Sequence, residues 1–254
     1  MKALLRQLNS VKTLCFLDLE GTQFSHEMIA LGAVKVNIRK DGSIKKIHRG
    51  YYTLVKAKNK VGKVVTDLTG ITDNELKKNG VPFRVAVANL KKYMGRDFTK
   101  CKYITFGNHD LRIIAQSLAY NLDVKKEDVQ ILIKHHFDFS EFASSYVKDE
   151  NNNNYSLANF LKVFNVEFKG EQHNALADAL NLVYLYDALL KRKDILKIEY
   201  TKVLAKQRHL PEPVHNVLND LLNDKTVSKA DFEKYVEESL KWSNIQTANH
   251  IHQT

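Results

Sequence analysis

Short apolar runs dominate the first sixty residues of the chain. Three runs, residues 14–19, 26–36 and 48–55, are separated by short polar segments, one of which contains the turn sequence Lys40-Asp41-Gly42-Ser43. Apolar runs bounded by turn residues are typical of β-strands, and short connections join antiparallel neighbours. We therefore expect the chain to begin with an antiparallel meander of three strands.

The apolar period changes after residue 56. A short helix is predicted at 73–78, and Pro82 opens an amphipathic helix whose apolar residues recur at helical spacing as far as Met94. Segment 128–134 fits either a helix or a strand. Two further strands then alternate with four helices, at residues 103–106 and 136–139 and at 111–118, 142–147, 156–164 and 174–190. This order predicts an α/β fold with a mixed five-stranded sheet flanked by helices.

The last sixty residues follow a different pattern. Three helical stretches come after the basic sequence Lys191-Arg192-Lys193, at residues 194–207, 214–222 and 228–242. Ser228 and Asp231 have the spacing of a capping box at the start of the third stretch, with Asp in place of Glu. We expect two parts, a sheet domain over residues 10–192 and a C-terminal helical extension over residues 193–254.

Composition and charge narrow the class of protein. The 254 residues include 39 Lys and Arg against 29 Asp and Glu, a net charge of +10, which favours a polyanionic partner such as nucleic acid. Two cysteines, Cys15 and Cys101, are too few for a disulfide framework and fit a reducing cytosol, so we expect a cytoplasmic protein. No apolar run approaches the ~20 residues of a membrane span. The N-terminus also lacks the apolar segment of a signal peptide.

The first predicted strand contains two acids, Asp18 and Glu20, within an apolar run. Successive side chains of a strand alternate between faces, so both acids share one face while Leu17 and Leu19 take the other. Two like charges about 4 Å apart repel by about 4 kcal/mol at an effective dielectric near 20. Either one acid stays protonated or a cation lies between them. The alternative is a half-exposed strand whose polar side faces water.

Three further residues stand out by their positions. Asp110 follows a predicted strand and begins a helix, where an acid is also favourable for the helix dipole alone. Asp178 lies among alanines and leucines in the last helix of the sheet domain, a poor place for a solvated charge. His173 and Asp178 would point ~140° apart within one helix. They converge only if His173 lies on the loop before the helix, which the break at Gly170 permits.

Four acids and one histidine form a donor set without thiolates. Clustered carboxylate oxygens suit hard cations, which points to Mg²⁺ or Mn²⁺. Two such ions ~3.5–4 Å apart clamp an in-line displacement at phosphorus, one activating water and the other stabilising the leaving oxygen. A histidine with a pKa near 6.5 can accept the proton of that water as a general base.

The three motifs together resemble the DEDDh branch of the 3′→5′ exonuclease superfamily, which is built on the ribonuclease H-like fold. The first motif is Asp18-Leu19-Glu20, the second is centred on Asp110, and the third runs from His173 to Asp178 with the His-x4-Asp spacing of the histidine branch. The resemblance extends over about residues 14–190. It implies that Asp18, Glu20, Asp110 and Asp178 hold two metal ions, and that His173 is the base.

Within the superfamily the chain is most similar to the group of the histone-mRNA 3′ exonuclease and the enhanced-RNAi exonucleases. The supporting stretches are residues 68–72, 103–111, 156–157 and 166–170. The first motif of that group usually continues to a threonine, which Gly21 and Thr22 satisfy, and we expect both residues at the substrate. The resemblance also suggests that Leu68 and Ile71 wedge at the 3′ end, with helix-start packing as the alternative.

A single strand needs aromatic faces for its bases and cations along its backbone. Phe24 lies just beyond the first motif, where it could stack on the terminal base or simply be an apolar loop residue. Four lysines of the loop that follows the third strand are a candidate phosphate path, although a charge run is usually only solvated: Lys56, Lys58, Lys60 and Lys63.

The sequence therefore predicts a metal-dependent 3′→5′ exonuclease that releases nucleoside 5′-monophosphates from single-stranded or overhanging ends, with RNA slightly favoured. One alternative is a DNA exonuclease of repair or proofreading. Another is a non-catalytic nucleic-acid-binding protein on the same scaffold, against which the presence of all five chemical residues argues. The helical extension could recruit a protein partner or mediate self-association.

Overall fold

Seven strands form one mixed sheet in the computed structural model, which describes residues 2–251. The strand order is β5-β4-β2-β1-β6-β7. Strand β3 pairs with the C-terminal end of β2, beyond the residues of β2 that pair with β4. Strand β2 is antiparallel to β1, β3 and β4. Strand β6 is parallel to β1 and to β7, and β5 is parallel to β4. The strands are β1 Thr13–Gly21, β2 Met28–Ile38, β3 Ile44–Ile47, β4 Tyr51–Lys56, β5 Val81–Pro82, β6 Lys102–Thr105 and β7 His136–Asp138.

The mixed sheet and its flanking helices confirm the predicted fold class, and β1, β2, β4, β6 and β7 are the five expected strands. Strands β3 and β5 were not predicted. Strand β5 has only two residues, and β3 exposes both of its lysines, so neither carries an apolar pattern. Both extend the sheet without changing the order of its centre.

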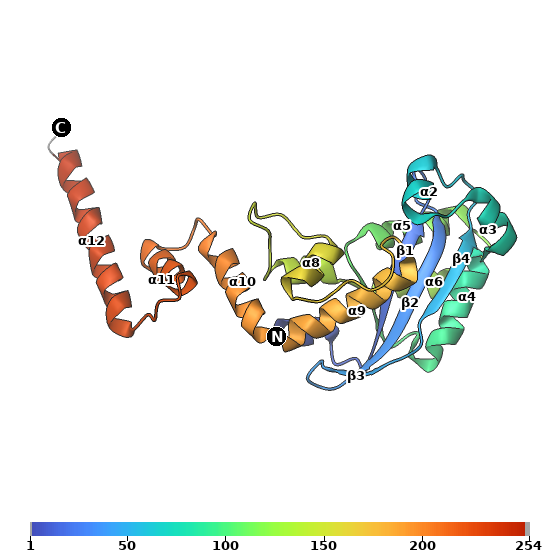
Figure 1. The fold of residues 1–254 in the computed structure, drawn as a ribbon, viewed down its shortest axis with the longest axis horizontal. Helices are drawn as coiled ribbons and strands as arrows, with labels where there is room; N and C mark the ends of the chain where they lie inside the picture. The colour runs from blue at the N-terminus through green and yellow to red at the C-terminus, as the bar shows by residue number, and fades with distance from the viewer. Residues whose placement is uncertain (1, 252–254) are drawn as a thin grey trace. The chain divides into compact units, whose positions relative to one another are not determined.

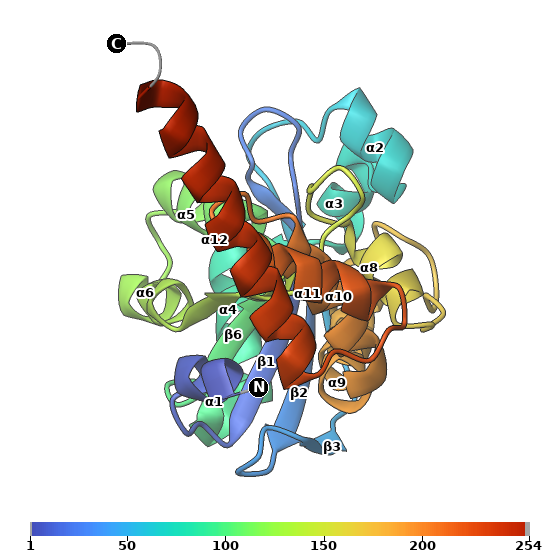
Figure 2. The same ribbon diagram turned by 90° about the vertical axis from the view of Figure 1, so that its left-hand side faces the viewer.

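Nine α-helices and one short 3₁₀ helix, Gly95–Asp97, accompany the sheet in the part of the chain before residue 193 that the structure describes. The α-helices are α1 Lys2–Leu8, α2 Lys63–Thr69, α3 Asp73–Asn79, α4 Phe83–Met94, α5 His109–Tyr120, α6 Lys126–Lys134, α7 Phe139–Ser144, α8 Leu157–Val163 and α9 Ala175–Lys191. The ambiguous segment 128–134 lies in α6. Phe139 begins α7 instead of ending a strand, because Asp138 Oδ1 accepts the Glu141 N–H at 3.1 Å. Figures 1 and 2 both show α2 and α3 at one end of the sheet and β3 at the other.

The two faces of β1 enter different layers, as the alternation predicted. Leu17 and Leu19 are buried in a cluster with residues of α4, α5 and α6. On the other face, the rings of Phe16 and Tyr186 of α9 meet edge to face at 5.5 Å. Asp18 shares the face of Phe16 by strand alternation and therefore faces the α9 side of the sheet.

The chain divides into two compact units. The first consists of Met1–Ser144 and Tyr155–Arg192, and the second of Ser145–Asn154 and Lys193–Thr254, with helices α10 Lys193–Ala205, α11 Glu212–Leu222 and α12 Lys229–Ile251. In the second unit, Lys206 Nζ donates to the carbonyl oxygens of Asp149 and Glu150. That residues 10–192 and 193–254 are separate folding domains stays a prediction.

The predicted capping box is present at the start of α12. Ser228 N–H donates to Asp231 Oδ2 at 2.8 Å, and Asp231 N–H donates to Ser228 Oγ at 3.2 Å. Among residues 2–251, no helix is both long enough and apolar enough to cross a membrane.

Candidate active site

Four carboxylates from three elements meet at the carboxyl end of β1. Oxygens of Asp18, Glu20 and Asp178 all lie within 4.8 Å of one another. Asp110, the second residue of α5, and His173, on the loop before α9, line the same cavity of about 260 Å³. The structure thus brings together the five residues that the sequence analysis selected.

Asp110 is held by the main chain of β1. Strand β6 pairs with β1 from Leu14 to Phe16, so β1 continues beyond the end of this neighbour. Leu19 N–H, three residues farther on, donates to Asp110 Oδ1 at 2.8 Å. The start of α5 is thereby fixed to the strand that carries the other two acids.

The position of Asp178 depends on Gly32. Gly32 is the register partner of Asp18 on β2, and a Cβ placed there would lie 2.1 Å from the Ala175 carbonyl oxygen. Only glycine lets the first turn of α9 come this close to the sheet. Asn174 caps the helix, because its Oδ1 accepts the N–H groups of Leu176 and Ala177. The close approach brings Asp178 over Asp18.

The electrostatics of the cluster favour a cation. Burial, then the charges of Asp110, Asp178 and Glu20, raise the pKa of Asp18 well above its usual value. Burial and neighbouring acids raise the pKa of Glu20 to about 8, and burial is the main cause that raises the pKa of Asp110 to about 7. Burial also raises the pKa of Asp178 to about 6, against the effect of a main-chain hydrogen bond and the imidazole of His173. A divalent cation would replace the protons that these acids otherwise retain.

The donor set fits a hard divalent metal. The clustered ligand atoms are carboxylate oxygens, and no cysteine lines the cavity. Oxygen donors without thiolates favour Mg²⁺ or Mn²⁺ over zinc or copper. Asp18, Glu20, Asp110 and Asp178 are the residues that would hold such ions.

His173 is exposed and lies outside the helix, as the sequence analysis required. Its backbone has a φ of 63°, in the left-handed region, between Gly170 with a φ of 85° and the helix cap Asn174. The turn directs the chain back toward the cavity, which His173 lines together with Gln172. His173 thus lines the cavity while its side chain stays exposed.

The predicted substrate residues differ in exposure. Phe24 is 82% exposed and Leu68 on α2 is 53% exposed, whereas Ile71 is buried in a small apolar cluster. Thr22 is also buried, and its Oγ1 accepts the Glu27 N–H and contacts the Ser25 hydroxyl. Gly21 lies against α5, where a Cβ would come within 2.9 Å of Ile113. Phe24 and Leu68 therefore have side chains free for a ligand, and Thr22 and Ile71 have theirs inside the protein.

Buried Glu27 anchors the basic loop that the sequence analysis considered as a phosphate path. Its Oε2 accepts the N–H groups of Lys58 and Asn59 and the amide of Asn59. Lys58 Nζ donates to the Tyr120 carbonyl oxygen. Next to this loop, Gln23 N–H donates to the Val61 carbonyl oxygen, and Gln23 Oε1 accepts the Val64 N–H. These bonds fix α2 against the loop that carries Phe24.

A group of basic residues beside the acids was missed by the sequence analysis. The His26 and His109 rings meet edge to face, with centroids 5.3 Å apart, and His109 lines the cavity. Arg112 lies one turn farther along α5. Burial and the Arg112 charge lower the pKa of both histidines. Among the described ion pairs none involves these residues. The only signal in the sequence was the position of His109 and Arg112 beside Asp110.

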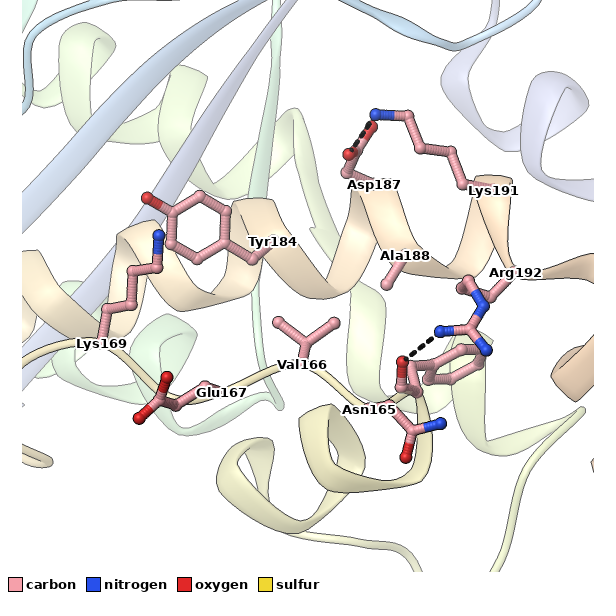
Figure 3. A pocket seen from close by; sticks show the side chains of 10 residues that line it. Asn165, Val166, Glu167, Lys169, Tyr184, Asp187, Ala188, Lys191 and Arg192 are labelled. Carbon is pink, nitrogen blue, oxygen red and sulfur yellow. Dashed lines mark hydrogen bonds and ion pairs between the residues drawn. The ribbon is translucent and has the colours of Figure 1, made fainter.

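The segment between α8 and α9 forms a wall shared by two cavities. Phe168 lines the carboxylate cavity, whereas Glu167 and Lys169 line a second cavity of about 390 Å³. In Figure 3 the segment runs alongside α9, with the Lys169 ammonium 4.9 Å from the centre of the Tyr184 ring. At the other end, Arg192 Nη1 donates to the Phe164 carbonyl oxygen at 3.2 Å.

Comparisons with solved structures identify similar folds. A full-length 3′-exonuclease is 16% identical with a TM-score of 0.58, covering 72% of this chain and 62% of that one. The nuclease domain of 3′hExo, a DEDDh family member bound to rAMP, is 17% identical with a TM-score of 0.56, covering 72% and 93%. E. coli Exonuclease I in complex with a dT13 oligonucleotide is 16% identical with a TM-score of 0.55, covering 75% and 43%.

The chain thus spans about three fifths of the full-length 3′-exonuclease it matches. A comparison with curated protein sequences gave no match. The RNase_T exonuclease family model matches residues 15–186, which include all three acidic motifs and the whole sheet except the first two residues of β1. The match confirms the predicted exonuclease superfamily: this chain belongs to the RNase_T exonuclease family.

Proposed function

We propose that the chain is a two-metal-ion 3′→5′ exonuclease that hydrolyses phosphodiester bonds at single-stranded or overhanging 3′ ends. The observation that carries this proposal is the convergence of Asp18, Glu20, Asp110, Asp178 and His173 on one cavity. The products are nucleoside 5′-monophosphates. RNA is slightly favoured, because the residue stretches that the chain shares with the histone-mRNA exonuclease group belong to enzymes that act on RNA.

The side chains have distinct roles in this proposal. The four carboxylates hold the divalent ions, which when bound supply charge stabilisation at phosphorus and a more acidic water. His173 accepts the proton of the attacking water, and its exposure lets that proton pass to solvent. Asp110 Oδ1 accepts the Leu19 N–H, so its second oxygen would be the one left for a metal ion.

The substrate strand is expected to bind at the cavity and on exposed residues of the neighbouring loop and helix. Phe24 offers an exposed ring for the terminal base, and Leu68 an exposed apolar side chain on α2. Thr22 and Ile71 are buried and Gly21 packs against α5, so these three would shape the surface from inside. Arg112, with His26 and His109, supplies donors for a backbone phosphate.

Matched RNA and DNA strands, each labelled at the 5′ end, test this function in the presence of Mn²⁺ or Mg²⁺ and again with EDTA. We expect a ladder that shortens from the 3′ end, release of 5′-monophosphates, and complete loss of activity with EDTA. Faster degradation of DNA would favour the repair or proofreading alternative. Binding without cleavage would favour a non-catalytic protein, and shortening from the 5′ end would overturn the polarity.

A further inference from the structure

Asn181 is a fully buried polar residue in the otherwise apolar middle of α9. Its Oδ1 accepts the Lys169 N–H at 2.9 Å. Its Nδ2 donates to the Lys169 carbonyl oxygen at 2.8 Å and to the Ala177 carbonyl oxygen at 2.9 Å. The amide thus pairs with both main-chain groups of one residue, as a neighbouring strand would, and all its hydrogen-bonding groups are used.

This pairing fixes one end of the segment that carries His173. The other end is fixed by the Asn174 cap of α9, so that only residues 170–173 lie between two anchored points. Gly170 turns the chain against α9, where a Cβ would lie 3.1 Å from Ala177 Cβ. A link of four residues between fixed ends has few conformations, and this restricts where the imidazole can lie.

We propose that Asn181 is a positioning residue that sets the place of His173 relative to the metal acids, an inference that rests on the proposed function. Asn181 follows Asp178 by one turn of α9, so the same helix turn that carries a metal acid also holds the loop of the base. Phe168, which lines the carboxylate cavity, directly precedes the residue that these bonds hold. Figure 3 shows the segment from Asn165 to Lys169 running alongside α9.

Without the hydrogen bonds between Asn181 and Lys169, the next main-chain anchor toward the N-terminus is the bond from Val166 N–H to the Leu161 carbonyl oxygen. The free link then grows from residues 170–173 to residues 167–173. A longer link lets the imidazole leave the attack geometry, and a displacement of about 1 Å can cost ~10²-fold in rate. The expected effect is on kcat, because the metal acids and the exposed substrate residues are unchanged.

A double-mutant cycle between Asn181→Ala and His173→Ala tests the inference on the full chain, with kcat and KM measured on a single-stranded oligonucleotide in Mn²⁺. We expect Asn181→Ala to lower kcat by roughly 10- to 100-fold and His173→Ala by roughly 10²–10⁴-fold. Adding Asn181→Ala to the His173→Ala protein should cause no further loss. Equal losses in both backgrounds, or an unchanged kcat in the single variant, would overturn the inference.

Lys169→Ala is the matched control. It removes the ammonium over Tyr184 but keeps the main-chain groups that Asn181 binds, so the wild-type kcat is expected. If Asn181→Ala does not fold, Asn181→Asp keeps the acceptor for Lys169 N–H and loses the two donated bonds, and the same non-additivity with His173→Ala is expected. Full activity of His173→Ala would instead show that the base of the proposed function is wrong, independently of Asn181.

Discussion

The two units of the chain differ in how their side chains are buried. In the unit of Met1–Ser144 and Tyr155–Arg192, strands β1 and β2 are almost entirely buried. In the helical unit, α10 contains no buried residue and α11 only Pro213, while Ile198, Leu221 and Leu240 are 55%, 47% and 61% exposed. Polar contacts, such as those of Asp220 with Lys225 and Tyr235, connect its helices.

The two parts also differ in charge. Residues 193–254 contain nine basic and nine acidic residues, so the whole net charge of +10 belongs to residues 1–192. The part that holds the carboxylate cavity is therefore also the part that attracts a polyanion. The neutral helices with exposed apolar residues are more suited to a protein partner or a second copy, which stays a prediction. The comparison teaches that the carboxylate cavity and the excess positive charge lie in the same part of the chain, residues 1–192.

The largest expected effect comes from removing a metal acid. Asp18→Ala should lower exonuclease activity by roughly 10³-fold or more, because bound metal supplies several kcal/mol of transition-state stabilisation. The same substitution at Asp231, which breaks the capping box of the helical unit, should leave activity unchanged. Rates on a labelled oligonucleotide, with circular dichroism as the check of folding, measure both. Equal losses in the two variants would contradict the division of roles.

Gly32→Ala tests the dense packing of the sheet unit. The added methyl meets the main chain of α9, which cannot move aside like a side chain, so the variant should lose about 1–3 kcal/mol of unfolding free energy or more. Gly50→Ala is the matched control, since a Cβ there meets the end of the Leu176 side chain, which can rotate. Urea unfolding of both proteins gives the comparison. Equal stability of the two variants would show that α9 does not rest on Gly32.

The metal-free protein should lose stability as the pH rises. The folded-state pKa values are about 6 for Asp178, 7 for Asp110 and 8 for Glu20, above the unfolded values near 4. The contribution of these protonated acids to the free energy of unfolding is therefore full below pH 4 and is lost as the pH rises through 6–8. Melting temperatures in EDTA should fall over this range, and Mn²⁺ should restore them at pH 8. Glu20→Gln should make the melting temperature in EDTA depend less on pH. A profile of Glu20→Gln identical to the wild type would contradict this origin.

A smaller effect is expected at Arg112. If Arg112 contacts one backbone phosphate, Arg112→Ala should reduce the slope of log affinity against log salt by about 0.7–1 for a single strand. Lys225→Ala in the helical unit, which removes the 2.8 Å ion pair with Asp220, should leave the slope unchanged. Fluorescence anisotropy in EDTA measures binding without cleavage. A reduced slope in the Lys225 variant would place nucleic-acid contacts in the helices as well.

Much of the site could be predicted because its signals are local in the sequence. The alternation in β1 fixed the common face of Asp18 and Glu20, and the break at Gly170 placed His173 outside the helix. Other features depend on contacts between distant segments. Gly32 lies 143 residues before Ala175, whose carbonyl it approaches, and no local pattern marks such a pair. The grouping of residues 145–154 with the C-terminal helices has the same non-local origin.

The hydrogen bond from Leu19 N–H to Asp110 Oδ1 gives the protein a reporter of its own site. The chemical shift of an amide proton that is hydrogen-bonded to a carboxylate depends on the charge of that carboxylate. This charge changes when the carboxylate loses a proton or binds an ion. Leu19 itself has no chemical role and its side chain points into the core. Its amide signal in a nitrogen-15 spectrum should therefore follow occupation of the cavity during a titration with Mg²⁺, without any label or substrate.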